Sequence, residues 1–289
     1  MSVSGPEQEL DRHFRQQVSA LPSQRTEVAV DLDRPIRAGT KLTGRQATAL
    51  FEAMLASRHL DLAARYLRRE GPGLYTIGSA GHESNAAIAA ALRPTDPALL
   101  HYRSGGFYCA RAQQIPGSTP LRDVLLGLVG AADEPIAGGR HKVFGNAEFA
   151  VIPQTSTIAS HLPRAVGVAF ALERAHRLNQ PCAWLPDAIV VCSLGDASVN
   201  HSTALGALNA AEHTAHQALR MPLLFCCEDN ALGISVRTPS DWVKAARSSR
   251  RHMRYFSADG TDIAGTYDAA VAAAKYVRSS RRPAFLHLF

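Results

Sequence analysis

The chain has 289 residues, of which 46% are hydrophobic and 19% are charged, and its formal net charge is +6. This composition is typical of a globular protein with a sizeable core, in one large domain or two small ones, and it excludes a disordered or fibrous chain. There is no basic stripe with aromatic residues between the cations and no apolar run long enough to span a membrane, so we expect neither a nucleic-acid nor a membrane partner. The five cysteines form no CxxC pair, which argues against a zinc site. Free thiols and the lack of an apolar signal core predict a soluble cytoplasmic protein.

Residues 1–41 are polar and irregular, and we expect them to form an arm with at most a short helix. The predicted domain spans residues 42–289. Its first helix should begin after Thr43, which can cap it, and end at Gly71-Pro72-Gly73. A glycine-rich turn at 75–83 then leads into a helix at 85–92, a turn at 93–96 and a short strand at 99–102.

Three unbroken apolar runs, at 188–194, 223–227 and 284–288, predict buried strands. Continuous rather than alternating hydrophobicity indicates parallel strands that are covered on both faces. Helices are expected at 121–129, 160–178, 202–219 and 267–277. This alternation predicts an α/β fold with a mostly parallel sheet and helices on both faces.

Polar residues follow two of the predicted strands. Gly195-Asp196 follows the first strand, and Asp229-Asn230 follows the second. Ligands bind beyond the carboxyl ends of parallel strands, so Asp196 and Asn230 should face one crevice if the strands are neighbours. A carboxylate and an amide oxygen, completed by a backbone carbonyl and phosphate oxygens, form an octahedral Mg²⁺ site. Ordinary strand-to-helix loops are the alternative, because Asp and Asn are common in turns.

Gly195-Asp196 and Asp229-Asn230, separated by a helix and a strand, resemble the GDG…NN motif of thiamine diphosphate enzymes. Five further segments recur in the same order in one family: YTIGSAGHE at 75–83, RPTD at 93–96, YR at 102–103, QTSTIASHLP at 154–163 and ADGTD at 258–262. From about residue 42 onward the chain therefore resembles the alpha part of the E1 component of 2-oxoacid (branched-chain or pyruvate) dehydrogenases. It comes closest to forms in which alpha and beta parts are fused.

The resemblance implies a thiamine diphosphate-binding fold and a set of site residues. Asp196, Asn230 and the backbone carbonyl of Leu232 would hold Mg²⁺. Tyr102 and Arg103 would contact the diphosphate, since arginine forms strong charge-assisted hydrogen bonds. The remaining residues expected at the cofactor are His101, Ser156, Ile158, Gly195 and Ala197. Apart from the resemblance, an exposed strand end is an equal alternative for Tyr102-Arg103, and a position in the hydrophobic core is the favoured interpretation of Ile158.

Three positions depart from the family pattern. Ala197 stands in place of the third glycine of GDG. Glu228 stands where arginine is frequent and cannot donate to a phosphate, so either another cation compensates or Glu228 points away. Ala231 replaces a glycine, which costs on the order of 1 kcal/mol if the position needs a positive φ.

The implied reaction is oxidative decarboxylation of a 2-oxoacid, with branched-chain substrates favoured over pyruvate and acyl transfer to a lipoyl-bearing acyltransferase. In this family a beta-type half supplies the catalytic glutamate, and we expect such a partner because no beta-part sequence is present. His82 and His141 are candidate catalytic residues, since a histidine can move protons near neutral pH; hydrogen-bonded loop histidines are the alternative. His161 and His201 are expected to be structural.

Three other functions remain open. A transketolase-type thiamine enzyme is disfavoured by the ordered matches. A catalytically incomplete fragment or assembly subunit is favoured by Glu228 and by the early stop at Phe289. A nicotinamide enzyme is disfavoured because no G-x-G-x-x-G opens the first helix of the sheet.

Overall fold

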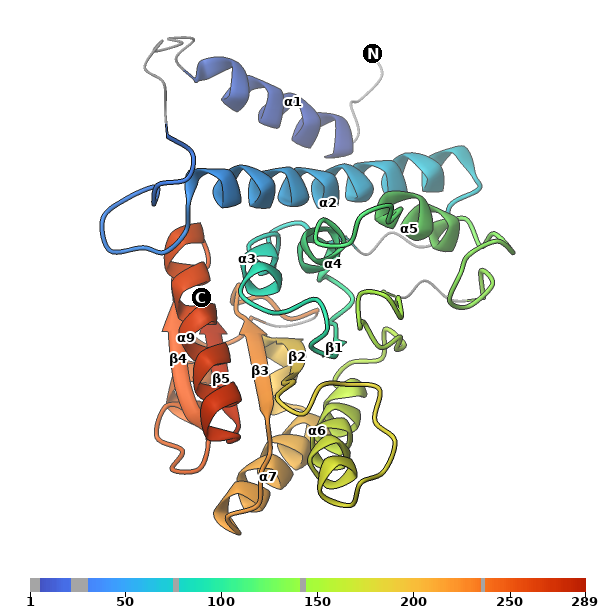
Figure 1. Ribbon diagram of the computed structural model, residues 1–289. Coiled ribbons are helices and arrows are strands. Elements are labelled where there is room, and N and C mark those ends of the chain that lie inside the picture. The colour runs from blue at the N-terminus through green and yellow to red at the C-terminus, as the bar shows by residue number, and fades with distance from the viewer. Residues whose placement is uncertain (1–5, 22–30, 75–77, 141–143, 235–236) are drawn as a thin grey trace.

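A computed structural model describes residues 6–21, 31–74, 78–140, 144–234 and 237–289. Its centre is a five-stranded parallel sheet with the strand order β1-β2-β3-β5-β4 (Figure 1). The strands are β1 (Ala98–Leu99), β2 (Val190–Gly195), β3 (Leu223–Glu228), β4 (Arg254–Ala258) and β5 (Ala284–Leu288). The predicted α/β class with a mostly parallel sheet is confirmed.

The three strands predicted from apolar runs are β2, β3 and β5, the buried centre of the sheet. The sequence did not predict β4, which lies at the sheet edge and whose side chains are exposed or half-buried. The predicted strand at 99–102 was too long at its carboxyl end. Strand β1 ends at Leu99, because the backbone N–H of His101 donates to the side-chain Oγ of Ser193 in β2 at 2.6 Å rather than to a backbone carbonyl of that strand.

Six of the observed helices match predicted ones: α2 (Gly44–Glu70), α3 (Asn85–Ala90), α5 (Pro120–Leu128), α6 (His161–Arg177), α7 (Ser202–His216) and α9 (Ile263–Ser280). The first of them begins and ends as its sequence predicts. Thr43 caps α2 in a reciprocal capping box with Gln46, and Gly71 ends the helix with a φ of 101°. Helices α4 (Gly105–Ala112), α8 (Trp242–Arg247) and the 3₁₀ turn η1 (Asp196–Asn200) were not predicted.

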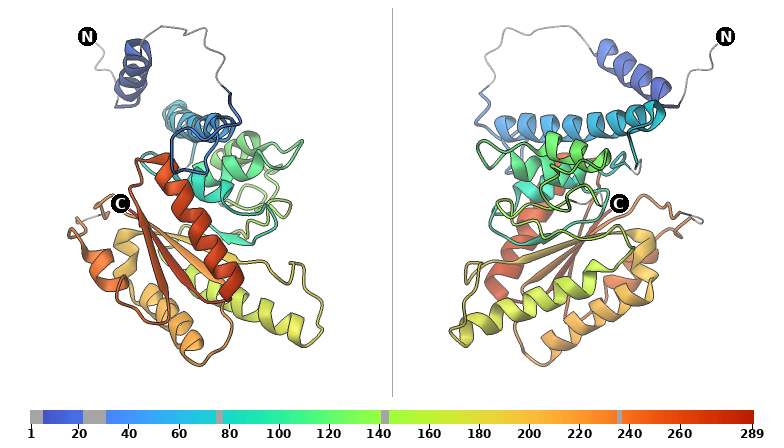
Figure 2. Two further views of the ribbon diagram at one scale, coloured as in Figure 1. Left: turned by 60° about the vertical axis from the view of Figure 1, so that its left-hand side comes forward. Right: turned by 90° about the vertical axis from the view of Figure 1, so that its right-hand side faces the viewer.

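Helices cover both faces of the sheet and form two hydrophobic clusters (Figure 2). Leu224 and Cys226 of β3 face the cluster built by α2, α3, α4 and α9. Phe225 and Cys227 of the same strand face the cluster built by α6, α7 and α8. Successive side chains of a strand point to opposite faces, so a continuous apolar run serves both clusters at once.

The segment before α2 contacts the rest of the molecule in two ways. Helix α1 (Pro6–Ala20), longer than the short helix expected there, lies beside α2. In the second half of the segment, Arg37 forms an ion pair with Asp262, and the backbone N–H of Lys41 donates to Asp268 Oδ1 at 3.0 Å. The division into an arm at 1–41 and a domain at 42–289 stays a prediction. Within the described ranges, no helix has the length and apolar character needed to cross a membrane.

Candidate functional site

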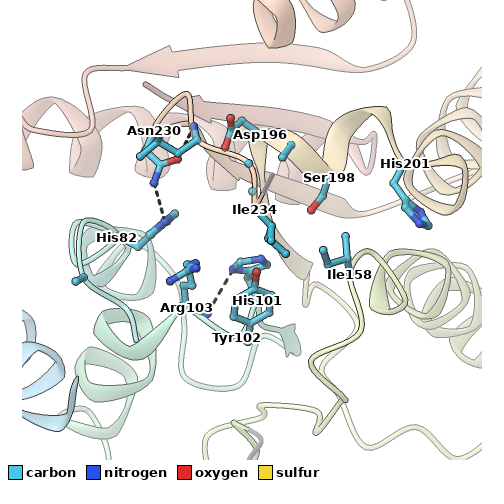
Figure 3. Close-up of a pocket in the computed structure, with 15 residues that line it drawn as sticks. His82, His101, Tyr102, Arg103, Ile158, Asp196, Ser198, His201, Asn230 and Ile234 are labelled. Atoms are coloured by element: carbon cyan, nitrogen blue, oxygen red, sulfur yellow. Dashed lines mark hydrogen bonds between the residues drawn. The ribbon is translucent and has the colours of Figure 1, made fainter. Parts of the chain in front are cut away.

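Strands β2 and β3 are hydrogen-bonded neighbours, with Gly195 opposite Glu228. Their polar carboxyl ends therefore open at the same edge of the sheet, as the sequence argument required. A cavity of about 420 Å³ lies at this edge. Its lining residues are Ala80, His82, His101, Tyr102, Arg103, Ile158, Gly195, Asp196, Ala197, Ser198, His201, Asn230, Leu232, Gly233 and Ile234 (Figure 3).

Most of the expected site residues are brought together here. Of the expected cofactor residues, Ser156 is described but does not line the cavity. Of the two catalytic candidates, His82 lines the cavity, whereas His141 lies outside the described residues. The sequence argument missed Ala80, Ser198, His201, Gly233 and Ile234. One of these, Ser198, lies in η1, the 3₁₀ turn at residues 196–200 that the sequence did not predict.

His201 and His161 both have structural roles. His201 caps α7 by accepting a hydrogen bond from the backbone N–H of Thr203 at 3.2 Å, and it also borders the cavity. His161 lies in the core, where its Nε2 contacts the backbone carbonyl of Ser193 at 2.6 Å. Burial lowers the pKa of His161 to about 4, so its ring is neutral at physiological pH.

Asp196 is the buried carboxylate of the cavity, with 2% of its surface exposed. Burial raises the pKa of this carboxyl, against the opposing effect of a hydrogen bond with the Thr238 side chain. Its Oδ2 atom has no hydrogen-bond partner among the described residues. A buried carboxylate oxygen without a partner is costly, and a divalent cation would satisfy it. The donor chemistry of the site therefore fits Mg²⁺.

The second strand end leads into a tight turn that also lines the cavity. Asn230 Oδ1 accepts a hydrogen bond from the backbone N–H of Leu232 at 3.1 Å, and Asp229 Oδ1 accepts one from Ala231 at 3.0 Å. Ala231 has a φ of 58°, so the turn uses the left-handed conformation that the replaced glycine would favour. Across the described ranges, no group of three or more His, Cys, Asp or Glu side chains could hold a metal ion. The candidate metal site instead combines one carboxylate with amide and carbonyl oxygens.

Glu228 points away from the cavity, the second of the two expected outcomes. Its Oε2 accepts hydrogen bonds from His82 Nδ1 at 2.8 Å and from Asn85 Nδ2 at 3.1 Å. Burial opposes a charge on the His82 ring, but the hydrogen bond and the negative charge of Glu228 together raise the pKa of His82. The carboxylate thus lies behind His82, and the ring separates it from the cavity wall at Asn230.

Arg103 lines the cavity as a cation held in a fixed position. Its Nη1 donates to the carbonyl of Gly78 at 2.7 Å, and its guanidinium lies 5.3 Å from the centre of the Tyr102 ring. Its backbone N–H donates to His101 Nδ1 at 3.3 Å. Burial, with the neighbouring charge of His82, lowers the pKa of His101 well below its usual value. A neutral His101 leaves Arg103 to supply positive charge for an anionic ligand.

Apolar side chains form the remaining wall and the mouth of the cavity. Ile158 is half-buried and packs against the cluster of α6 and α7 while it also lines the cavity. Leu232 and Ile234 are 60% and 80% exposed at the mouth. The cavity is therefore lined both by the charged groups of Asp196 and Arg103 and by apolar side chains, which suits a ligand with an anionic and an apolar part.

The family model for the dehydrogenase E1 component matches residues 52–289. The chain belongs to this family. The E1 chain is 25% identical over 238 residues to the mouse mitochondrial 2-oxoisovalerate dehydrogenase subunit alpha, covering 81% of this chain and 49% of that protein. It is 28% identical over 256 residues to the corresponding Bacillus subtilis subunit, covering 85% and 70%. The chain thus spans about half the length of its mouse relative.

Two solved structures share the fold of this E1 chain. Transketolase from Leishmania mexicana aligns with a TM-score of 0.56 at 15% identity, and a transketolase mutant from Pichia stipitis aligns with 0.52 at 17%. Each alignment covers 83% of this chain and 36% of the other. At such identities the likeness concerns the fold alone. The fold and the family predicted from the sequence are both confirmed.

Proposed function

We propose that this E1 chain binds thiamine diphosphate and Mg²⁺ in the 420 Å³ cavity, as the diphosphate-binding half of a 2-oxoacid dehydrogenase. The observation that carries the proposal is the buried Asp196 carboxylate, whose Oδ2 has no hydrogen-bond partner in the described part of the chain. Asn230 and Leu232, from the neighbouring strand end, line the same cavity. A carboxylate, an amide oxygen and a carbonyl oxygen are the ligands that Mg²⁺ prefers beside phosphate.

We assign the following roles in cofactor binding and catalysis to the residues of the cavity. Asp196, Asn230 and the carbonyl of Leu232 would hold the cation, while Arg103 and Tyr102 would hold the diphosphate. Bound thiamine diphosphate would supply an electron sink for the loss of carbon dioxide. His82 is a candidate for moving a proton, because its ring lines the cavity and Glu228 fixes its other nitrogen.

The remaining assignments are also proposals. Ile158 would support the cofactor from the apolar wall, and Ser156 and His141 keep the roles expected from the sequence. Gly195, Ala197 and His101 would lie against the diphosphate end. Leu232 and Ile234, at the mouth of the cavity, would contact the bound cofactor from the solvent side.

We propose a branched-chain 2-oxoacid as the substrate, since the relatives are named 2-oxoisovalerate dehydrogenases. The acyl group would pass to a lipoyl-bearing acyltransferase. The partner would be a beta-type half that supplies the catalytic glutamate, in line with the names of the relatives, which are alpha subunits. Closeness to fused alpha-beta forms stays a prediction. The five free cysteines favour a reducing compartment such as the cytoplasm.

A catalytically incomplete assembly subunit is the second candidate. No glutamate lines the cavity among the described residues, so the chain does not itself place the expected catalytic carboxylate there. A transketolase-type reaction has the shared fold in its favour, but the E1 family match is more specific.

Calorimetric titration with thiamine diphosphate and Mg²⁺ tests the proposal, on the chain alone and mixed with a beta-type E1 half, with decarboxylation of 2-oxoisovalerate followed in parallel. We expect Mg²⁺-dependent cofactor binding, and turnover only in the mixture. Asp196→Ala should abolish the metal-dependent binding, whereas Asp187→Ala, at an exposed carboxylate, should not. If the cofactor binds neither to the chain alone nor to the mixture with the beta-type half, the proposal is refuted. Binding without turnover in the mixture would favour the assembly subunit.

A further inference from the structure

Three side chains form a line of hydrogen bonds from the protein interior to the candidate metal site. Glu228 Oε2 lies 2.8 Å from His82 Nδ1, and His82 Nε2 lies 3.4 Å from Asn230 Nδ2. Glu228 and His82 are 6% and 5% exposed. Figure 3 shows the last of these contacts, between His82 below the cavity and Asn230 above it.

The chemistry of these groups sets the direction of each hydrogen bond. An ionised carboxylate can only accept, so His82 Nδ1 must carry the hydrogen that faces Glu228. Glu228 raises the pKa of His82, so the ring is neutral only above that raised pKa. The Nε2 atom of the neutral ring presents a lone pair, and it can accept only from the amino group of Asn230. A reversed Asn230 amide would set an oxygen lone pair against the Nε2 lone pair.

The orientation of this amide decides which Asn230 atom is available to a cation. With Nδ2 turned to His82, Oδ1 is the atom on the other side, where it accepts the backbone N–H of Leu232 at 3.1 Å. A carbonyl oxygen has two lone pairs, so Oδ1 retains one for a metal ion. A reversed amide would offer that ion an amino group, which cannot bind it.

A carboxylate at position 228 is otherwise hard to explain. Its Oε1 atom is buried and has no hydrogen-bond partner among the described residues, which is unfavourable for a charged group. Burying a neutral glutamine would cost less free energy than burying a charged carboxylate, but the glutamine amide can donate as well as accept. Only an acceptor that cannot donate restricts His82 to one tautomer.

We propose that Glu228 is a positioning residue for the metal ligand Asn230 and acts through His82. The inference rests on the proposed function, because it assigns the cation to Asn230. It gives a role to the position where the family pattern often has an arginine. Groups hydrogen-bonded directly to a metal ligand commonly change metal affinity by about 10- to 100-fold when they are altered, and Glu228 acts one hydrogen bond further out, through His82.

A double-mutant cycle separates this role from a structural one. Glu228→Gln lets the residue donate to His82 Nδ1, which permits the other tautomer. The change removes one of the two contacts that hold the Asn230 amide, and the Leu232 N–H on Oδ1 remains. We expect the Mg²⁺ affinity, titrated calorimetrically in the presence of thiamine diphosphate, to fall by about 10-fold, the lower end of the range for a direct partner of a metal ligand. Asn230→Asp gives the ligand two equivalent oxygens. In that background Glu228→Gln should change the affinity by less than about twofold.

Two controls complete the design. Glu212→Gln removes another poorly exposed carboxylate, paired with Arg247, and should leave Mg²⁺ affinity unchanged. Thermal unfolding of each variant checks that it is folded. An equal loss of affinity from Glu228→Gln in the Asn230 and the Asn230→Asp backgrounds would overturn the proposal.

The tautomer itself can be measured without cofactor. Nitrogen-15 shifts of His82 at about pH 8.5, where histidine is normally neutral, distinguish a hydrogen on Nδ1 from one on Nε2. We expect Nδ1–H in the wild-type chain and a mixture in Glu228→Gln. An Nε2–H tautomer in the wild-type chain contradicts the inference even if the cofactor binds. If His82 carries the hydrogen on Nδ1 but the chain binds no cofactor, the hydrogen-bond direction is correct and the proposed function is wrong. The positioning role of Glu228 is then also wrong, because it depends on the proposed function.

Discussion

Protonation of His161 is expected to destabilise the fold as the pH falls. The ring is 3% exposed, and its Nδ1 has no hydrogen-bond partner in the described part of the chain. Burial lowers the pKa of His161 to about 4, compared with about 6.5 in an unfolded chain. Between these two values the unfolded chain binds a proton that the folded chain does not, so the free energy of unfolding decreases as the pH falls through this window. The full difference in pKa corresponds to roughly 3 kcal/mol.

Urea unfolding at pH 7 and at about pH 4.5 measures this contribution. The free energy of unfolding of the wild-type chain should be lower at about pH 4.5 than at pH 7. For His161→Asn this decrease should be smaller by roughly 2 to 3 kcal/mol, whatever the stability of the variant at pH 7. His13→Asn, at an exposed position on α1, is the matched control and should behave as the wild type. If His161→Asn and the wild type show the same difference between the two pH values, the buried neutral histidine is not the cause.

Two further predictions concern stability, and chemical denaturation measures both. Asp96→Asn breaks the ion pair between the fully buried Asp96 and the partly buried Arg278, whose Nη2 lies 2.6 Å from Asp96 Oδ2, and should lower the free energy of unfolding by about 3 kcal/mol. The exposed Asp187→Asn should cost less than about 1 kcal/mol, and equal losses would contradict the argument from burial. Ala231→Gly should stabilise the chain by up to about 1 kcal/mol, because Ala231 has a positive φ. Ala210→Gly, on the exposed face of α7, should instead destabilise it by a similar amount, and a destabilising Ala231→Gly would show that the turn is not strained.

The sequence predicted the centre of the sheet because burial on both faces leaves a visible pattern. β2, β3 and β5 are continuous apolar runs, and each is buried along almost its whole length. β4 has no such pattern, since an edge strand with half-exposed side chains requires only a few apolar residues. A propensity argument applied to residues 254–258 alone does not distinguish a strand from a loop.

The candidate site was predictable where it depends on strand ends, and not where it depends on local turns. Asp196 and Asn230 each follow an apolar strand, so their proximity followed from neighbouring parallel strands. Ser198 and Ile234 line the cavity through turns that lack a periodic signal. The pairing of His82 with Glu228 joins residues 146 positions apart, and nothing in the sequence near either residue indicates it.

The strand order also has a consequence for how the chain is assembled during synthesis. β5 is the last strand in the sequence, but it lies between β3 and β4. Until residues 284–288 leave the ribosome, β4 has no hydrogen-bonding partner in the sheet, and one edge of β3 is unpaired. Unpaired edges of apolar strands readily join other chains. A nascent chain that stalls before β5 would therefore expose its central strand, and chaperone binding should be strongest at that length.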